Sequence, residues 1–312
     1  MKSIMYHYIQ DYNNDSPYFN FLDVKDFEKQ ILYFKDKYNF IEKDDFLNSI
    51  KSEEPVSGVL LTFDDGLKCH YDYVLPILVK YKLFGIFYIP TDIFNNNKLI
   101  NVHRIHHLIG SNHIDLLTDY LLKVVPKNFI NPKYVKYYGD KIYYNQNLLE
   151  KVENFKLILN YYIKSKYRNN VIDSLMSNFC EDEVLLKKDY YLSKRNIKAL
   201  DDAGMIIGSH SVDHPVLSKL NYNEQNFQIQ SSFYEIEKIL GAKKIRTFCY
   251  PYGGFRSFNI TTEKLLDEHS VLFSFNVEPR DISSNDLKYN LQKLPRYDCN
   301  AFPYGSIFDY SK

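Results

Sequence analysis

VLLTFDDG, at residues 59–66, decides the fold class of this chain. An apolar run that is bounded by turn residues is typical of a buried strand, and Asp64 and Asp65 stand where that strand ends. Adjacent residues of a strand point to opposite faces, so the two carboxylates can diverge toward different partners in one cleft. An ordinary Asp-Gly turn after a strand would explain the same letters. Two later stretches favour the functional interpretation.

Strands and helices alternate on both sides of this stretch. The pattern predicts strands at 2–8, 40–41, 59–63, 84–89, 205–208, 245–250 and 271–275, with helices after Asp23 and at 46–50, 73–81, 193–202, 224–240 and 261–269. Such alternation is typical of an α/β fold with a mostly parallel sheet or barrel. Between 96 and 191 only helical patterns recur, at 114–125, 148–163 and 171–180. We therefore predict one catalytic domain over residues 1–312, with a helical insertion over 96–191.

The composition excludes several classes of partner. Lysine plus arginine equals aspartate plus glutamate at 39 each in the 312 residues, so no net charge favours nucleic acid or an anionic membrane. No stretch approaches the roughly 20 apolar residues of a membrane span. The first residues lack the apolar run of a signal peptide. The four cysteines are scattered without CxxC spacing, and we expect free thiols in a cytoplasmic protein.

The second stretch is SHSVDHP, which follows the strand predicted at 205–208. His210 and His214 are four residues apart, a spacing that places both imidazoles on one face of a helical turn and within reach of one ion. Two unrelated loop histidines would give the same letters. Functional groups of parallel α/β folds gather at the carboxyl ends of strands. One carboxylate and two imidazoles would then suit a divalent metal, with positions left open for water and substrate.

The third stretch is FCYPYGG at residues 248–254, again at a predicted strand end. Its central residues are Tyr250, Pro251, Tyr252 and Gly253. Aromatic rings beside proline and glycine could form a groove wall on which a sugar ring stacks. A rigid turn covered by tyrosines explains the letters equally well, and both interpretations stay open.

Together, the three stretches resemble the polysaccharide deacetylase family, also called the NodB-homology or carbohydrate esterase 4 family. Residues 62–66 match its TFDDG motif, residues 210–214 its H[ST]xxH motif and residues 250–253 its third motif. The resemblance covers residues 1–94 and 191–303. It implies a distorted (β/α) barrel with seven parallel strands, with Asp64 as general base. It also implies that Asp65, His210 and His214 bind a divalent metal, usually zinc and sometimes cobalt or nickel.

Two features depart from the common family pattern. Cys249 stands where the third motif usually has arginine, and residues 294–298, LPRYD, lack the late Leu-x-His that provides the usual acid. The opening Tyr6-His7-Tyr8 is similar to the permuted members that deacetylate poly-N-acetylglucosamine. This resemblance implies that His7 is the general acid.

Arg296 could supply the cationic partner that Asp64 lacks when position 249 is a cysteine. A salt bridge of Arg296 with Asp298, or with another surface acid, is the alternative.

The resemblance implies a metal-dependent hydrolase that removes an N-acetyl group from an amino sugar. We expect the substrate to be a nucleotide- or lipid-linked precursor of a surface glycan. A sugar de-N-formylase, an O-deacetylase and a catalytically silent glycan-binding homologue are the alternatives. His103, His106 and His107 open the insertion. We interpret them as one helix face, in the cleft or in solvent, rather than a second metal pair, and His103 is the rival of His7 for the acid.

Overall fold

The computed structural model describes residues 1–11, 16–139, 142, 149–242 and 245–306. Its contacts divide the chain into two compact units. Unit 1 comprises Met1–Tyr12, Phe21–Asn95 and Asp189–Phe308, and unit 2 is built mainly from Asn96–Lys188. The core of unit 2 thus falls within the range predicted as a helical insertion. The predicted organisation as one catalytic domain with this insertion stays a prediction.

Unit 1 alternates strands and helices, as the sequence predicts. Its strands are β1 (Lys2–Tyr6), β2 (Ile9–Gln10), β3 (Leu22–Asp23), β4 (Val59–Phe63), β5 (Gly85–Ile89), β6 (Ile206–Ser209), β7 (Thr247–Cys249), β8 (Phe273–Phe275) and β9 (Tyr297–Asp298). Its α-helices are α1 (Val24–Lys37), α2 (Lys43–Ser52), α3 (Leu75–Tyr81), α10 (Lys194–Asp202), α11 (Tyr222–Leu240), α12 (Ile260–Glu268) and α13 (Ser284–Tyr289).

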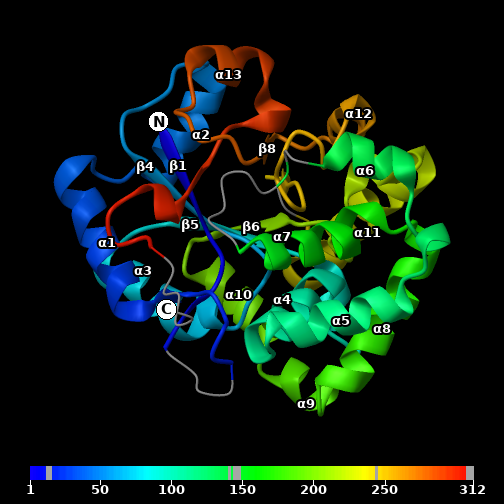
Figure 1. Ribbon diagram of the computed structural model, residues 1–312. Coiled ribbons are helices and arrows are strands. Elements are labelled where there is room, and N and C mark those ends of the chain that lie inside the picture. Colours follow the sequence, from blue (N-terminus) through cyan, green and yellow to red (C-terminus); the bar gives the residue numbers. More distant parts are fainter. Residues whose placement is uncertain (12–15, 140–141, 143–148, 243–244, 307–312) are drawn as a thin grey trace. The chain divides into compact units, whose positions relative to one another are not determined.

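Seven of these strands form one sheet in the order β8-β7-β6-β5-β4-β1-β9 (Figure 1). Every neighbouring pair in it is parallel. Residues 294–298 contact both edges of the sheet, since Leu294 pairs with Phe275 of β8 and Tyr297 pairs with Ile4 of β1. The sheet therefore curls on itself. The predicted barrel-like α/β fold with seven parallel strands is confirmed.

Local sequence explains where several helices begin. Asp23 caps α1 by accepting a hydrogen bond from the Lys25 amide, and the predicted apolar face of α1 is buried at Phe27, Ile31 and Phe34. Ser193 caps α10 with Asn196 in a reciprocal pair of hydrogen bonds.

Several predicted boundaries were wrong, among them those of the first strand, the strand at 40–41 and the helix at 73–81. The first strand ends at Tyr6 and not at Tyr8. The predicted strand at 40–41 is a single bridge between Phe40 and Val59, because only one residue pairs there. The predicted helix at 73–81 begins earlier, as a π-helical turn over His70–Val74 that runs into α3.

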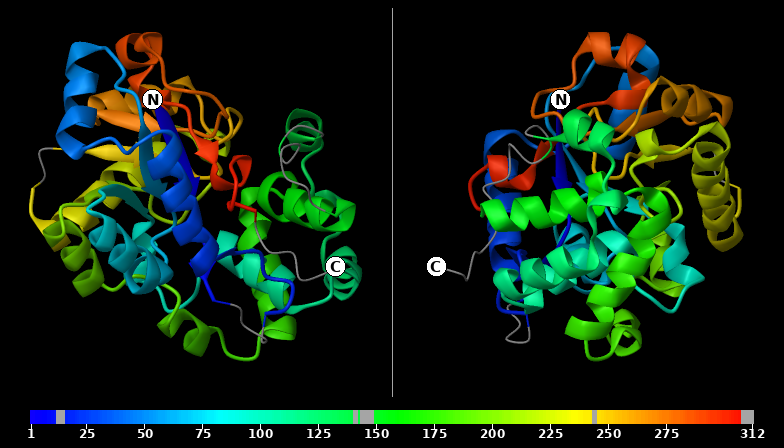
Figure 2. Two further views of the ribbon diagram at one scale, coloured as in Figure 1. Left: turned by 90° about the vertical axis from the view of Figure 1, so that its left-hand side faces the viewer. Right: turned by 45° about the vertical axis from the view of Figure 1, so that its right-hand side comes forward.

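The described part of unit 2 consists of helices joined by loops, with one isolated bridge between Ile130 and Ile163. Its α-helices are α4 (Asn101–Ser111), α5 (Ile114–Val124), α6 (Pro132–Tyr138), α7 (Glu150–Leu157), α8 (Ser165–Phe179) and α9 (Glu183–Lys188), and the turn Ile158–Tyr162 is π-helical. Residues of α4, α5, α7 and α8 share one apolar core. The ribbons of these helices lie together in Figure 2, coloured from cyan-green to green. The predicted helix at 148–163 starts with Leu148, which lies outside the described residues. Nowhere in the described chain is a helix long and apolar enough to cross a bilayer.

Candidate active site

Asp64 is held by Arg296 in a buried two-point ion pair. Arg296 Nη1 donates to Asp64 Oδ1 at 2.9 Å, and Nη2 donates to Oδ2 at 2.8 Å. Neither side chain is more than 2% exposed. Parallel N–H···O bonds of this kind fix the orientation of a carboxylate as well as its charge. The structure therefore brings together the two residues between which the sequence suggested a charge pair, and Arg296 does not pair with Asp298.

The curled sheet explains how Arg296 reaches Asp64. Asp64 and Thr62 are two residues apart at the end of β4, so both point to the face that Arg296 occupies, and Arg296 Nη1 also donates to Thr62 Oγ1 at 2.9 Å. The Arg296 Nε donates to the backbone carbonyl of Asn276 at 3.1 Å. Residues 294–298, which close the sheet, thus place the Arg296 guanidinium beside Asp64. Hydrogen bonds to Asn276, Thr62 and Asp64 fix its position.

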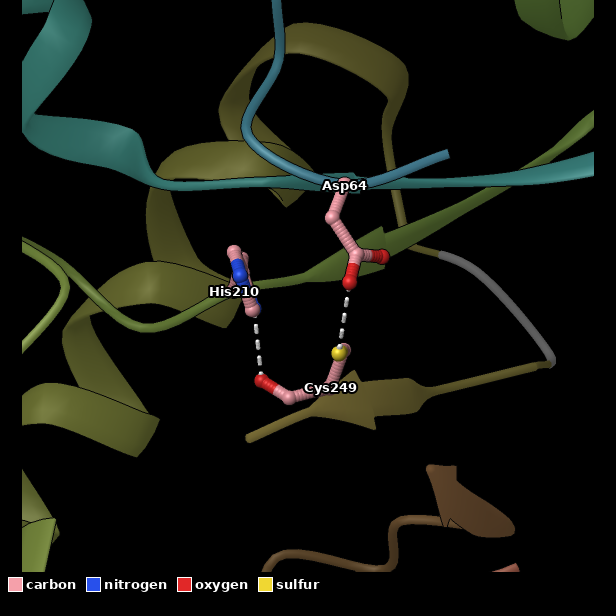
Figure 3. Close-up of side chains that lie close together, drawn as sticks. All are labelled: Asp64, His210 and Cys249. Atoms are coloured by element: carbon pink, nitrogen blue, oxygen red, sulfur yellow. Dashed lines mark hydrogen bonds between the residues drawn. The ribbon is translucent and has the colours of Figure 1, made fainter. Parts of the chain in front are cut away.

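Cys249 completes this cluster from β7. Its thiol donates to Asp64 Oδ2 at 3.3 Å (Figure 3). Arg296 Nη2 lies 2.9 Å from its sulfur. Its backbone carbonyl accepts a hydrogen bond from His210 Nδ1 at 2.7 Å. Because a carbonyl only accepts, Nδ1 of His210 carries a proton, so the neutral form of the ring has its lone pair on Nε2.

The charges around Asp64 keep it ionised. Burial alone would raise the pKa of Asp64, but the positive charges of Arg296 and His210 and the hydrogen bonds from Arg296 outweigh burial and lower that pKa to about 2. Burial likewise raises the pKa of the Cys249 thiol. At neutral pH, the cluster holds a carboxylate beside a neutral thiol.

Asp65, His210 and His214 form the candidate metal centre. Asp65 Oδ1 lies 3.4 Å from His210 Nε2 and 3.5 Å from His214 Nε2, and all three side chains are buried. One donor atom from each lies within 4.8 Å of the others. Two donors that each lie about 2.0–2.1 Å from a zinc ion at a tetrahedral angle are about 3.3–3.4 Å apart. The donor set therefore fits one divalent ion, and the His210–Cys249 bond aims His210 at it.

A second donor set, Asp64, His210 and Cys249, is also close enough for one ion. This set already contains a fixed cation, because Arg296 contacts both Asp64 and the Cys249 sulfur. A metal ion there would be repelled by the nearby guanidinium of Arg296. The charge of the Asp64 carboxylate is already neutralised by Arg296 and would attract the ion less. The set with Asp65 is therefore the better metal site.

The backbone around the centre is conformationally strained. The predicted helical turn at 210–214 is wrong: the segment is a loop, in which Ser211 has φ 67° and His214 has φ 59°. Asp65 has φ 78° and Tyr252 has φ 64°. Left-handed backbone is rare outside glycine, and strain of this kind clusters at functional sites. Left-handed residues, and not a helix face, turn both imidazoles toward Asp65.

His7 stands beside both carboxylates. Its Nε2 lies 4.0 Å from Asp64 Oδ2 and 4.0 Å from Asp65 Oδ2, and its side chain is 35% exposed. This separation exceeds a hydrogen bond. His7 is thus a partly exposed imidazole next to two buried carboxylates.

His70 holds the backbone of His7 in place, a contact that the sequence did not suggest. His70 Nε2 donates to the His7 carbonyl at 2.7 Å, and the ring packs against Phe63 and Phe87. Burial lowers the pKa of His70 to about 4, although the bond to the His7 carbonyl opposes this shift. The neutral imidazole comes from the π-helical turn, an irregularity that is frequent at functional sites.

The four residues predicted to form a wall of the substrate groove differ in how far they are buried. Tyr250 is buried, stacks on Phe258 at 3.8 Å and donates its hydroxyl to the Gln292 carbonyl, so it belongs to the core and cannot stack on a sugar. Pro251 and Gly253 are also buried. Gly253 is required there, since an added Cβ would lie 2.3 Å from the Val277 side chain. Tyr252 alone is partly exposed, with its ring 4.8 Å from the His214 ring.

The three other histidines singled out in the sequence belong to unit 2. All lie on α4, where His103 is fully buried, and His106 and His107 are partly buried. Burial lowers the pKa of His107. The metal-binding groups found among the described residues include none of the three. The interpretation of His103 as a helix-face residue in solvent is therefore wrong.

Comparisons with known proteins agree with this site. The sequence model of the family "Polysaccharide deacetylase" matches residues 161–271, a range that includes His210, His214 and the third motif but not Asp64 or Asp65. No curated protein sequence matches the chain.

Several solved structures share the fold at low identity. Deacetylase PplD of Streptococcus pyogenes, in complex with acetate, is 17% identical, with a TM-score of 0.59 over 98% of this chain and 95% of that one. A polysaccharide deacetylase from Bacillus cereus is 17% identical, with a TM-score of 0.54 over 95% of this chain and 64% of that one. A de-N-acetylase from Aggregatibacter actinomycetemcomitans is 14% identical, with a TM-score of 0.53 over 95% and 93%. The family model that matches residues 161–271 and the fold shared with the solved structures confirm the resemblance drawn from the motifs.

Proposed function

We propose that this protein is a metal-dependent hydrolase that removes the N-acetyl group of an amino sugar. The observation that carries the proposal is the placement of Asp64 beside a complete set of metal-ligand atoms. Asp64 is buried and ionised by its pair with Arg296, while Asp65 presents a separate carboxylate to His210 and His214. A protein that only bound glycans would need neither the oriented carboxylate nor the ligand set.

Asp65, His210 and His214 would hold the metal ion, most suitably Zn²⁺, with Co²⁺ or Ni²⁺ as substitutes. A divalent ion bound there would lower the pKa of a water molecule and polarise the acetyl oxygen. When they bind the ion, His210 and His214 would be neutral and Asp65 would be ionised. The bond from His210 Nδ1 to the Cys249 carbonyl selects the neutral tautomer whose Nε2 is available to the ion.

Asp64 would act as the general base. It would take one proton from the attacking water as the new C–O bond forms at the acetyl carbon. Arg296 would keep Asp64 ionised and aimed at that water, since both carboxylate oxygens accept from its guanidinium. The same pair makes Asp64 a weak base, so Asp64 would accept a proton only from a water molecule that is more acidic than bulk water.

His7 would act as the general acid. An amine leaves poorly unless it is protonated, and a partly exposed imidazole can carry a proton near neutral pH and release it. His7 would give that proton to the sugar nitrogen as the C–N bond breaks, so that acetate and the free amino sugar are the products. His70 would hold the His7 main chain during this step. Tyr252 would border the substrate beside His214.

The substrate class can be tested with a panel of N-acetylated nucleotide sugars and chito-oligomers. Mass spectrometry after incubation with the zinc-loaded protein should find loss of one acetyl group from at least one panel member, with acetate released in equal amount. The Asp64→Asn variant is the matched control, because it keeps the size of the side chain and removes the base. Loss of formyl instead of acetyl would favour a de-N-formylase, and ester cleavage alone an O-deacetylase. Stoichiometric metal without any turnover would favour a silent glycan-binding homologue.

A further inference from the structure

The segment that carries the two metal-binding histidines needs support from outside itself. Ser211 and His214 both adopt left-handed backbone, with φ 67° and 59°. Such a conformation is unfavourable for a residue with a side chain and persists only where the surroundings determine it. The backbone carbonyls of Ser211 and Val212 accept hydrogen bonds from Thr91 and Asp92. Inside the segment, the His214 amide donates to the Ser211 hydroxyl at 3.1 Å. The amides of Val212 and Asp213 have their partner outside the segment.

Gln228 of α11 fixes the middle of the segment. Its Oε1 accepts from the backbone amides of Val212, at 3.0 Å, and Asp213, at 3.3 Å. Its Nε2 donates to Asp213 Oδ1 at 2.6 Å. Gln228 is only 8% exposed, so losing these bonds would leave polar groups without water to replace them. One side chain thus holds the two residues that lie between Ser211 and His214.

Ser232 secures the start of the segment from the same face of α11, one helical turn later. Its hydroxyl donates to the Ile229 carbonyl at 2.8 Å and lies 2.5 Å from the Ser209 hydroxyl. Because the Ser232 proton is used on that carbonyl, Ser209 is the donor between the two hydroxyls. Ser209 Oγ in turn accepts from the Ser211 amide at 3.2 Å. A continuous chain of hydrogen bonds therefore runs from α11 to the residue after His210.

We propose that Gln228, supported by Ser232, is the positioning residue of the metal centre. It holds the loop in the left-handed conformation that aims His210 and His214 at Asp65, and it touches neither the ion nor the reacting atoms. This role rests on the proposed metal centre. Partners that orient metal ligands typically contribute about 10- to 100-fold to metal affinity. Gln228 and Ser232 are polar residues on the buried face of α11.

Gln228→Glu tests the role with little change of shape. One carboxylate oxygen can still accept from the two amides, but the other now faces Asp213 Oδ1, so two like charges meet in place of a donor and an acceptor. We expect zinc affinity to fall roughly 10- to 100-fold. Adding Asp213→Asn should recover most of the loss, since the new amide can donate to the new carboxylate. Gln230→Glu makes the same charge change at an exposed position of α11 and should leave affinity unchanged.

Zinc affinity is measured on full-length protein by competition with a chromophoric chelator, and far-UV circular dichroism verifies folding. Gln228→Met, which removes all three hydrogen bonds without adding charge, should weaken zinc binding in the same direction and serves if Gln228→Glu does not fold. A merely structural residue would lower the melting temperature of the metal-free protein and leave the zinc Kd of the folded protein unchanged.

Two results would overturn the proposal in distinguishable ways. Suppose that the wild type binds one zinc ion. A folded Gln228→Glu variant that binds zinc as tightly as Gln230→Glu would then refute the role of Gln228 and leave the metal centre in place. Wild-type protein that binds no zinc would overturn the metal centre itself, and the positioning role with it. Recovery of affinity in the double variant supports the proposal, and failure of the folded double variant to recover contradicts it.

Discussion

Replacing Arg296 should destabilise the protein through Asp64. Arg296→Met keeps most of the side-chain volume and removes the charge, leaving a fully buried carboxylate without its cation. The fall in the Asp64 pKa from 3.8 to about 2 corresponds to about 2.5 kcal/mol of stability at pH 7, because each pKa unit is about 1.4 kcal/mol. Without the cation, this contribution to stability is lost. The unfavourable free energy of burying the Asp64 carboxylate is then no longer compensated. Breaking a buried pair from one side typically costs about 3–5 kcal/mol, and we expect a loss in that range.

The pH dependence follows from the direction of the shift. In the wild type, a lowered pKa stabilises the fold fully above about pH 4, and this contribution is lost as the pH falls toward 2. In Arg296→Met, burial should instead raise the pKa of Asp64, so the carboxyl protonates at higher pH and then needs no cation. The difference in stability between the two proteins should therefore shrink on acidification. Adding Asp64→Asn to Arg296→Met should restore part of the loss at neutral pH.

Urea unfolding of the metal-free proteins, followed by far-UV circular dichroism at several pH values, measures these differences. Circular dichroism suits this chain because it contains no tryptophan. Arg195→Met is the matched control, since Arg195 is exposed on α10. The reasoning fails if Arg296→Met loses no more stability than Arg195→Met at pH 7. It also fails if the double variant with Asp64→Asn is less stable than Arg296→Met alone.

Three further predictions concern the metal and the acid. His210→Ala should lose stoichiometric zinc, measured by inductively coupled plasma mass spectrometry, while far-UV circular dichroism stays unchanged; metal retained by a triple alanine variant of Asp65, His210 and His214 would refute the ligand set. His7→Gln should keep the metal and lower amide turnover by roughly 10²–10⁴-fold, with a smaller loss on an ester, because an alcohol leaves more readily than an amine. Near wild-type amide turnover in that variant would show that another residue is the general acid. His70→Phe should reduce turnover at unchanged metal content because the His7 carbonyl loses its donor, and His70→Gln, whose amide can donate there, should recover part of it; equal rates in both variants would argue against this contact.

The order of strands and the main site motifs could be read from the sequence. The apolar run before Asp64 and the alternation of strands with helices predict a parallel sheet, because burial on both faces demands continuous apolar strands. The HxxxH spacing placed His210 and His214 near one another at a strand end, although the loop conformation that unites them was predicted wrongly. These features are local, so periodicity and turn residues reveal them.

Only the tertiary structure decided which distant residues complete the site. Arg296 is 232 positions from Asp64 along the chain, and the two meet because residues 294–298 join both edges of the sheet. His70 reaches His7, and Gln228 reaches Asp213, through side chains that no motif distinguishes. Tyr250 and Tyr252 look alike in the sequence, yet one is buried and the other borders the site. Contacts between elements depend on how the sheet curls and on which helix face meets it, and a periodic pattern specifies neither.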